Sequence, residues 1–315
     1  MPKVKAMRES KLIDKGRARR SRGSLSVNPQ VLSATLVLLP SVLAVGLFVY
    51  AFIAWTGFIS LTNSRFAPQY DFVGLSQYAK LWATDRWITS VVNLGFFSIL
   101  FIGITLLVGL VLAILLDQRI RAENVIRTIY LYPMAISFIV TGIAWKWLLT
   151  PDLGIEKMVR SWGYSDFKFD WIVDSRMAIY TIVIAAFWQS AGFVMAIFLA
   201  ALRGVDGEIV KAARIDGANS FQIYASIIVP MLRPAFLSVV VILLFQALRS
   251  FDLVVALTNG GPGFASDLPT TFMFKYTFGR SQLAQGAASA IMITMTVAAI
   301  MIPYLYSELR NERRH

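Results

Sequence analysis

Few residue types in this chain could carry catalytic chemistry, and the polar side chains of most interest lie inside apolar stretches. The 315 residues include no cysteine, and the single histidine is His315. Thiolate nucleophiles, disulfides and histidine-based metal sites or catalytic triads are therefore excluded. The remaining polar groups suit hydrogen bonding to a polar solute, so we expect a binding pathway with no catalytic residue and no metal site.

Two groups of polar and aromatic residues are candidates for that pathway, because polar groups inside a lipid-embedded segment are costly and mark solute or ion routes by default. A polar solute needs hydrogen-bond partners for its polar groups and an apolar surface for the rest of the molecule. The candidates are Gln189, Ser190, Phe193, Gln246, Arg249, Ser250 and Asp252. A structural alternative stays open, in which Gln189 and Ser190 bond a neighbouring helix and Arg249 pairs with Asp252 three residues along one helix face.

The elements that must position these residues are transmembrane helices. Hydrophobic residues make up 57% of the chain and charged residues 15%, against about a quarter charged in an ordinary soluble domain. A helix needs about 20 mostly apolar residues to cross a bilayer. Six stretches meet this requirement, so we predict an all-α integral membrane protein with about six transmembrane helices. The stretches are residues 31–56, 91–116, 129–149, 177–202, 234–257 and 285–306.

The distribution of positive charge predicts the orientation. Nine of the 30 Lys and Arg residues lie in the first 22 positions, directly before the first apolar stretch. The segments that would then face inward carry about twice as many Lys and Arg residues as those facing outward, which follows the positive-inside rule. We therefore expect a basic cytoplasmic arm (1–30), a transmembrane domain (31–306) and a cytoplasmic tail (307–315), with both termini inside.

The longest inward loop, residues 203–233, has the pattern of two short helices around a glycine turn. Asp206 can cap the first helix, and Gly217 suits a left-handed residue at its end. Asn219 and Gln222 have the spacing of a capping box for the second helix. A helical pair longer than a linker requires is a surface for meeting a partner, although a lipid-surface helix pair would fit the same pattern.

Part of this loop resembles a known family. Lys-Ala-Ala-Arg-Ile-Asp-Gly-Ala at 211–218, followed by Ile-Ile-Val-Pro at 227–230, is similar to the EAA loop of ABC importer permeases. In that family the loop forms a coupling helix that docks on the ATP-binding subunit. The resemblance implies a coupling role for Lys211, Ala212, Ala213, Arg214, Asp216, Gly217 and Ala218. Lys211 departs from the glutamate usual at its position, which reverses a charge and puts the family's ion pair there in doubt.

A second resemblance narrows the class to carbohydrate importers of the maltose and glycerol-phosphate type. It is carried by Ser-Phe-Asp-Leu-Val-Val-Ala-Leu-Thr-Asn-Gly-Gly-Pro-Gly at 250–263, with residues 142–147 and 151–154, and looks like the larger maltose permease subunit. It implies a multi-pass protein of a bacterial inner membrane that forms half of a heterodimeric sugar pore. The implied partners are a second permease subunit, an extracytoplasmic sugar-binding protein and two ATP-binding subunits that hold ATP and Mg. Nucleic acid is not an expected partner.

Two other classes of protein compete with the importer interpretation. An ion-coupled secondary transporter would use Arg249 and Asp252 as its coupling pair. A membrane-embedded enzyme would need a clustered nucleophile, acid or metal set, and the apolar stretches supply only one Asp, one Arg and one Lys. The sequence contains no GxxxxGK[ST] phosphate loop, so we expect ATP hydrolysis on a separate subunit.

Overall fold

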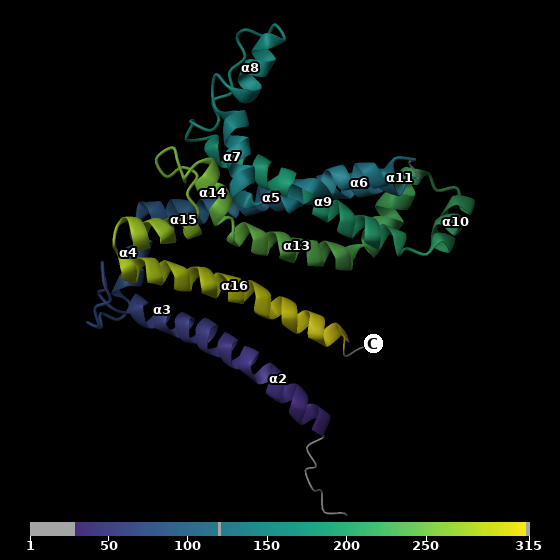
Figure 1. Cartoon of the computed structure of the whole chain (residues 1–315). Coiled ribbons are helices and arrows are strands. Elements are labelled where there is room, and N and C mark those ends of the chain that lie inside the picture. The colour runs from purple at the N-terminus through teal and green to yellow at the C-terminus, as the bar shows by residue number, and fades with distance from the viewer. Residues whose placement is uncertain (1–28, 119–120, 313–315) are drawn as a thin grey trace, which may run out of the picture. The chain divides into compact units, whose positions relative to one another are not determined.

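The computed structural model describes residues 29–118 and 121–312, so most of the predicted basic arm and the last three residues of the predicted tail lie outside the described residues. The described chain is almost entirely helical (Figure 1), with one isolated β-bridge between Thr62 and Phe72. It divides into two compact units at Ile53 and Ala54. An all-helical fold was predicted from the sequence, and the structure confirms it.

The first unit consists, in its described part, of one continuous helical segment. α2 (Pro29–Val45) passes through a π-helical turn, η1 (Gly46–Ala51), into α3 (Phe52–Ser60), which continues into the second unit. Residues Val37–Ser60 are long and apolar enough to cross a membrane, with a mean hydropathy of 2.4. This helix corresponds to the first predicted span.

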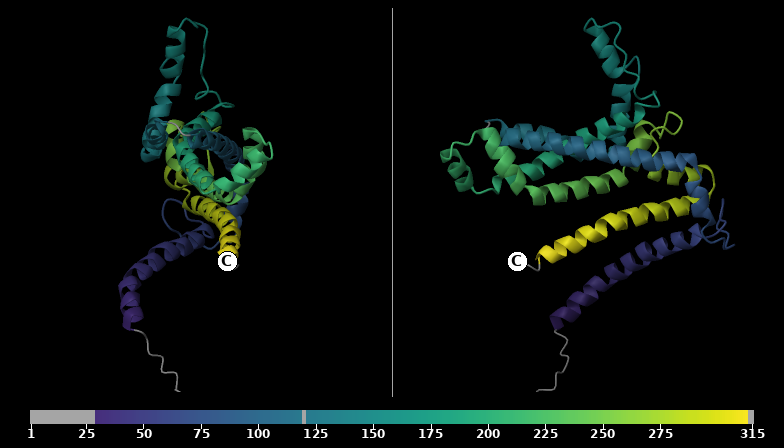
Figure 2. Two further views of the ribbon diagram at one scale, coloured as in Figure 1. Left: turned by 90° about the vertical axis from the view of Figure 1, so that its right-hand side faces the viewer. Right: turned by 180° about the vertical axis from the view of Figure 1, so that it is seen from behind.

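The second unit is built around α9 (Ala178–Arg203), the most deeply buried of the long helices. α5 (Asp85–Asp117) and α13 (Arg233–Leu248) pack along α9, and the three helices run side by side in both views (Figures 1 and 2). Phe97 and Phe101 of α5 meet Met195 and Phe198 of α9 in a fully buried core. α16 (Leu283–Glu312) packs on α15 (Pro269–Phe274) and α4 (Ser76–Trp82). α16 continues through the predicted end of the last span at residue 306.

The chain bends sharply at two places, one inside the third predicted span and one just before the fifth. The third predicted span bends by 101° between α6–η2 (Glu123–Ala135) and the helices that follow, and the chain leading into the fifth bends by 66° at Leu232. Each bend has a physical cause: Pro133 and Ser137 interrupt the third span, and Pro230 and Pro234 surround the bend before α13. Among the described residues, four helices are long and apolar enough to cross a membrane, and up to six spans result if each bent pair counts as one.

The fifth predicted span, residues 234–257, also ends earlier than expected. α13 stops at Leu248, Arg249 and Ser250 have non-helical backbone angles, and α14 (Phe251–Leu257) begins a separate helix. α14 packs on α7 (Phe138–Leu149), where an added side chain on Gly142 would meet Ala256. The break therefore directs α14 toward the third span.

The bundle places the candidate coupling loop far from the other long loops. α10 (Gly207–Ile215) and α11 (Ser220–Ile223) lie at one end, whereas α14 and α8 (Gly154–Ser161) lie at the other (Figures 1 and 2). In the 150–176 segment, Arg160 pairs with Glu156, whose side chain is buried, and with exposed Asp152 at 2.9 Å. This segment is thus held together by its own ion pairs.

The loop between α14 and α15 is fixed by a buried carboxylate. Asp267 is fully buried and lies 2.6 Å from the Nε of Arg86 on α5, and its Oδ1 accepts a hydrogen bond from Thr271 at 2.6 Å. The Lys275 ammonium lies 4.0 Å from the same carboxylate. Burial lowers the pKa of Lys275, Asp267 opposes that shift, and Arg86 adds to it. Asn93 of α5 donates to the carbonyls of Ala265 and Asp267. The loop is therefore bound to α5 in two ways, by the Arg86–Asp267 ion pair and by the hydrogen bonds from Asn93.

Candidate functional site

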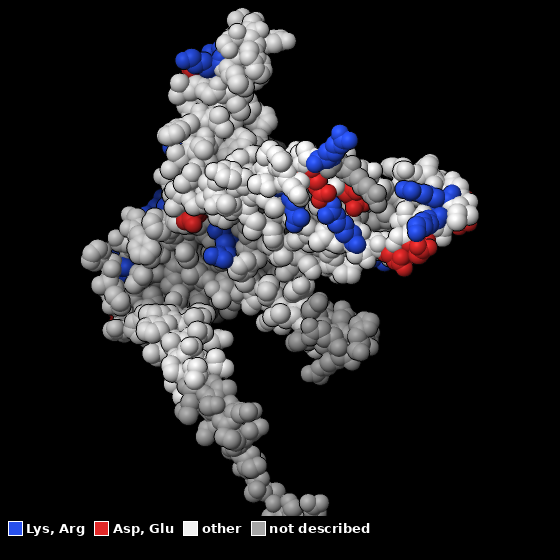
Figure 3. All heavy atoms as spheres, turned by 45° about the vertical axis from the view of Figure 1, so that its right-hand side comes forward, with Lys and Arg blue, Asp and Glu red and all other residues white. Residues whose placement is uncertain are grey.

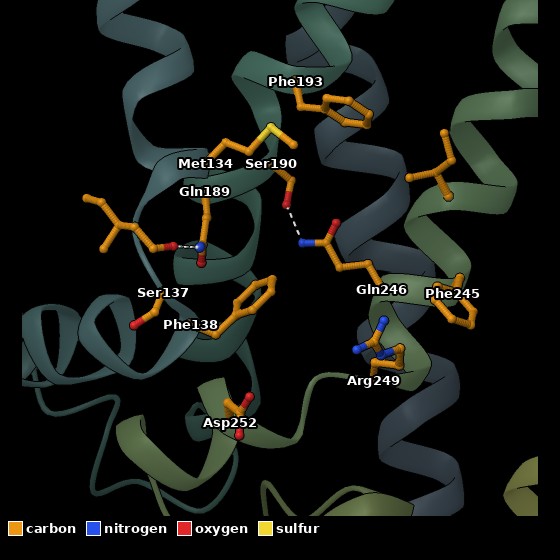
Figure 4. Close-up of a pocket in the computed structure, with 12 residues that line it drawn as sticks. Met134, Ser137, Phe138, Gln189, Ser190, Phe193, Phe245, Gln246, Arg249 and Asp252 are labelled. Carbon is orange, nitrogen blue, oxygen red and sulfur yellow. Dashed lines mark hydrogen bonds between the residues drawn. The ribbon is translucent and has the colours of Figure 1, made fainter. Parts of the chain in front are cut away.

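A cavity of about 390 Å³ brings together six of the seven predicted pathway residues (Figure 4). Its size falls within the range of small-molecule sites. Three elements form its walls: the break between η2 (Tyr132–Ala135) and α7, the middle of α9, and the end of α13 with the start of α14. The lining residues are Met134, Ile136, Ser137, Phe138, Gln189, Ser190, Phe193, Ile242, Phe245, Gln246, Arg249 and Asp252.

Ser250, the seventh predicted residue, does not line the cavity. Its side chain is buried, and its hydroxyl donates to the Gln246 carbonyl at 2.9 Å. Ser250 therefore stabilises the end of α13, and its contact with a solute stays a prediction.

The broken third span creates the first wall and fixes Gln189. Because the helix stops at Ile136, the Ile136 carbonyl has no helical partner, and it accepts a hydrogen bond from the Gln189 Nε2 at 2.6 Å. The other amide atom of Gln189, Oε1, is buried without a hydrogen-bond partner among the described residues. A buried acceptor left unpaired is costly, so this oxygen suits a hydroxyl donor supplied from the cavity.

A direct bond joins the second and third walls. The Gln246 Nε2 lies 2.7 Å from the Ser190 Oγ, to which it donates across the cavity from α13 to α9 (Figure 4). Gln189 and Ser190 therefore both bond a neighbouring segment, as the structural alternative in the sequence analysis predicts. Phe138, Phe193 and Phe245 supply apolar surface among these groups. The cavity therefore offers amide, hydroxyl and aromatic groups, the combination that binds polyhydroxylated rings.

Arg249 and Asp252 line the cavity without pairing with each other, which corrects the expected ion pair. The helix ends between them, so the i, i+3 geometry that pairing required is absent. The described residues include no ion pair at either side chain, and the Arg249 guanidinium lies over the Phe245 ring at 5.2 Å. Both charges thus remain available at the cavity.

Several lining residues were missed by sequence reasoning. Met134, Ile136, Ser137 and Phe138 face the cavity because the third span breaks there. Proline in Tyr-Pro-Met-Ala-Ile-Ser, followed by a serine able to cap a helix, was the available signal. Ile242 and Phe245 carried no such signal, since apolar residues in a span look alike from sequence.

The coupling segment has the local geometry that the sequence predicted. Asp206 caps α10 by accepting from the Glu208 amide at 2.9 Å, and Gly217 has a φ of +84°. Asn219 and Gln222 form a reciprocal capping box at the start of α11. These three predictions are confirmed, and the two capped helices with the turn between them form a helix–turn–helix.

The predicted coupling residues differ in exposure. Ala213 is buried against the bundle and Ala218 is half-buried, whereas Lys211, Ala212, Arg214, Asp216 and Gly217 are exposed. Lys211 pairs with Glu208 at 2.8 Å. The largest apolar side chains exposed on this segment are Ile215 and Phe221, at 86% and 81%. Sequence reasoning missed both, although an isoleucine and a phenylalanine flanking a tight turn are a plain signal for a contact surface.

Three relatives are similar to the chain over most of its length. A probable ABC transporter permease of Pyrococcus horikoshii is 38% identical over 91% of this chain and 99% of the relative. The xylose/arabinose import permease protein XacH of Haloferax volcanii is 33% identical, covering 78% and 77%. The trehalose/maltose transport system permease protein MalF of Thermococcus litoralis is 30% identical, covering 86% and 91%.

A solved structure of a bacterial alginate ABC transporter, in complex with an alginate-bound periplasmic protein, shares the fold. One of its chains matches with a TM-score of 0.76 and 19% identity, covering 87% of this chain and 93% of that chain. The similarity supports the helical arrangement described above. Residues 105–314 match the family model described as the binding-protein-dependent transport system inner membrane component. The chain therefore belongs to the family of binding-protein-dependent transport system inner membrane components, the permease subunits of ABC importers, and is a transport component rather than an enzyme.

Proposed function

We propose that this permease forms one half of a pore that imports a sugar, and that the cavity between α7, α9 and α13 is part of the sugar's route. The observation that carries the proposal is the combination of a buried, unpaired Gln189 acceptor with Ser190, Gln246 and Arg249 among three phenylalanines. Relatives named for xylose/arabinose and trehalose/maltose transport support a sugar as the solute. No finding supports the ion-coupled alternative, and Arg249 and Asp252 lack the ion pair on which it depended.

The remaining parts of the importer are proposed from the family. A second permease subunit completes the pore, an extracytoplasmic binding protein delivers the sugar, and two ATP-binding subunits with ATP and Mg dock on residues 203–233. Both termini then face the cytoplasm. ATP binding changes the relative stability of inward- and outward-facing states, and the coupling segment transmits that difference to the helices.

The test is ATP-dependent uptake by proteoliposomes that contain the complete importer. Radiolabelled pentoses, hexoses and disaccharides are offered one at a time with the matching binding protein outside and ATP inside. Accumulation of at least one sugar that requires ATP supports the proposal. Uptake driven by an ion gradient in liposomes that hold this permease alone would contradict it.

Replacing Arg249 with alanine should reduce uptake about tenfold, since charge-assisted hydrogen bonds to a solute contribute about 1.5–3 kcal/mol. The Arg249 side chain is exposed at the cavity and makes no described ion pair, so assembly of the complex should be preserved. Initial uptake rates and complex yield are measured together. Arg176→Ala, which removes an exposed arginine of the 150–176 segment, is the matched control. Wild-type uptake by Arg249→Ala would remove this residue from the site.

Replacing Gly217 with valine should uncouple ATP hydrolysis from transport. A β-branched residue is strained at a φ of +84°, at about 1–2 kcal/mol, so the turn between α10 and α11 would change shape. Gly163→Val is the matched control, because Gly163 also has a positive φ, +101°, and open space around it, but lies in the 150–176 segment at the other end of the bundle. We expect normal membrane insertion, at least about a tenfold loss of uptake for Gly217→Val, and little loss for the control. Equal uptake by the two variants would refute the coupling role of the turn.

A further inference from the structure

A second cavity, of about 620 Å³, lies beside the coupling segment. It is bounded by the last residues of α5 and α9, by one side of α10, and by α11 with η3 (Tyr224–Ile228). Its wall includes apolar side chains such as Leu202 and Ile223, and its rim is polar. The cavity is therefore continuous with the surface that we propose meets the ATP-binding subunit.

The basic residues of α10 line the cavity, and the acidic residues next to them in the sequence do not. Val210, Lys211 and Arg214 line the cavity with helical spacing, whereas the acidic residues Glu208 and Asp216 do not line it. Figure 3 shows basic and acidic side chains next to one another at this end of the molecule. Positive charge is thus directed toward the cavity.

This positive charge is only partly compensated. Arg203, Lys211 and Arg214 line the cavity, and Asp117 is the one acidic residue among its described lining. Asp117 accepts a hydrogen bond from the Tyr224 hydroxyl at 3.2 Å rather than pairing with one of the three cations. Arg214 has no ion pair in the described part of the chain.

Arg203 and Lys211 each form an ion pair, and the two pairs differ in how exposed they are. Arg203 pairs with half-buried Glu123 at 2.5 Å, which fixes it to α6. Lys211 pairs with Glu208 across the exposed surface, where both side chains are more than two-thirds exposed. Exposed pairs of this kind contribute about 0–1 kcal/mol, so Lys211 can exchange Glu208 for a better-placed carboxylate at little cost.

We infer that an acidic side chain of the ATP-binding subunit enters this cavity and pairs with Lys211 and Arg214. This inference rests on the proposed function and adds to it a second contact beside the apolar tip formed by Ile215 and Phe221. The tip supplies apolar area to the partner, and the cavity receives a carboxylate from it. An apolar contact and an ionic contact together would hold the coupling segment on the partner more firmly than either contact alone.

The experiment measures binding of the ATP-binding subunit to the complete permease pair in nanodiscs at several NaCl concentrations. Lys211→Gln combined with Arg214→Gln should weaken binding about tenfold at low salt and flatten the salt dependence, because charged pairs at an interface are screened by salt. Lys157→Gln combined with Lys168→Gln is the matched control, since it removes two exposed lysines from the 150–176 segment at the other end of the bundle. The control should bind as the wild type does.

A charge-reversal rescue identifies the partner's residue. Arg214→Glu should weaken binding further, and one Asp→Lys or Glu→Lys variant of the ATP-binding subunit should restore it. Unchanged affinity and salt dependence in the Lys211→Gln/Arg214→Gln pair would overturn the inference. Saturable binding of inorganic phosphate to the permease pair alone, lost in the same variant, would also overturn it by assigning the cavity to a free anion.

A variant of the apolar tip distinguishes failure of this inference from failure of the proposed function. Ile215→Ser with Phe221→Ser should weaken binding at every salt concentration, because it removes apolar area rather than charge. If the wild-type pair binds no ATP-binding subunit at all, the proposed function fails. If it binds and only the cavity variants are without effect, the proposed function stands and the acidic contact is wrong.

Discussion

Replacing Asp267 with asparagine is expected to lower the free energy of unfolding of the permease by about 3–5 kcal/mol, the usual cost of removing one partner of a buried ion pair. The Asp267 carboxylate is fully buried, and the Arg86 side chain beside it is 15% exposed. Without the carboxylate, Arg86 and Lys275 would face each other as uncompensated cations. The loop from α14 to α15 would then be attached to α5 only through the hydrogen bonds that Asn93 donates to the backbone carbonyls of Ala265 and Asp267.

The measurement is thermal unfolding of the purified permease pair in detergent, followed by fluorescence and by size-exclusion chromatography. Asp152→Asn is the control, since its carboxylate also contacts an arginine but is 80% exposed, and it should change stability by less than about 1 kcal/mol. Arg86→Met combined with Asp267→Asn should lose less than the sum of the two single variants, because neither charge is then left alone. Strictly additive losses would show that the two side chains do not stabilise each other.

Sequence reasoning succeeded where the controlling interactions were local. The caps at Asp206 and Asn219 and the left-handed Gly217 each depend on residues within three or four positions, so type and spacing were sufficient. The apolar stretches were found because composition alone determines what a bilayer accepts. The same reasoning missed the helix breaks at Ser137 and Arg249. Hydropathy is an average over a window of residues, so it does not report a bend of the helix within that window.

The candidate cavity could be predicted only as a list of residues. Gln189 contacts the carbonyl of Ile136, 53 positions earlier, and Gln246 contacts Ser190, 56 positions earlier. Asp267 pairs with Arg86 at a separation of 181 residues. Contacts at such separations follow from how the helices pack, which periodicity along one helix does not encode. The Arg249–Asp252 pair, one of the alternatives left open by the sequence, is absent for the same reason, since it assumed a continuous helix.

The contact between α6 and α9 shows how closely the packing determines the site. Gly192 of α9 lies against the backbone of Tyr130, and an added Cβ would overlap the Tyr130 carbonyl oxygen. This approach holds the broken third span against α9, three residues from the amide of Gln189. Backbone atoms cannot change rotamer to relieve a clash as a flexible side chain can. A methyl group at this position must therefore move α6 and α9 apart.

Gly192→Ala is therefore expected to destabilise the permease by about 1–3 kcal/mol, the usual range for an overpacked interior, and to reduce sugar uptake more than stability alone explains. Gly103→Ala on α5 is the matched control, because its added methyl group would meet nothing within 4 Å. In a helix interior alanine is favoured over glycine by roughly 0.5–1 kcal/mol. Gly103→Ala should therefore stabilise the permease, whereas Gly192→Ala should destabilise it. Thermal unfolding and uptake of both variants are compared with the wild type. Equal stability of the two variants would show that α9 and Tyr130 are not in close contact in the membrane, and the wall built on Ile136 and Gln189 would have to be redrawn.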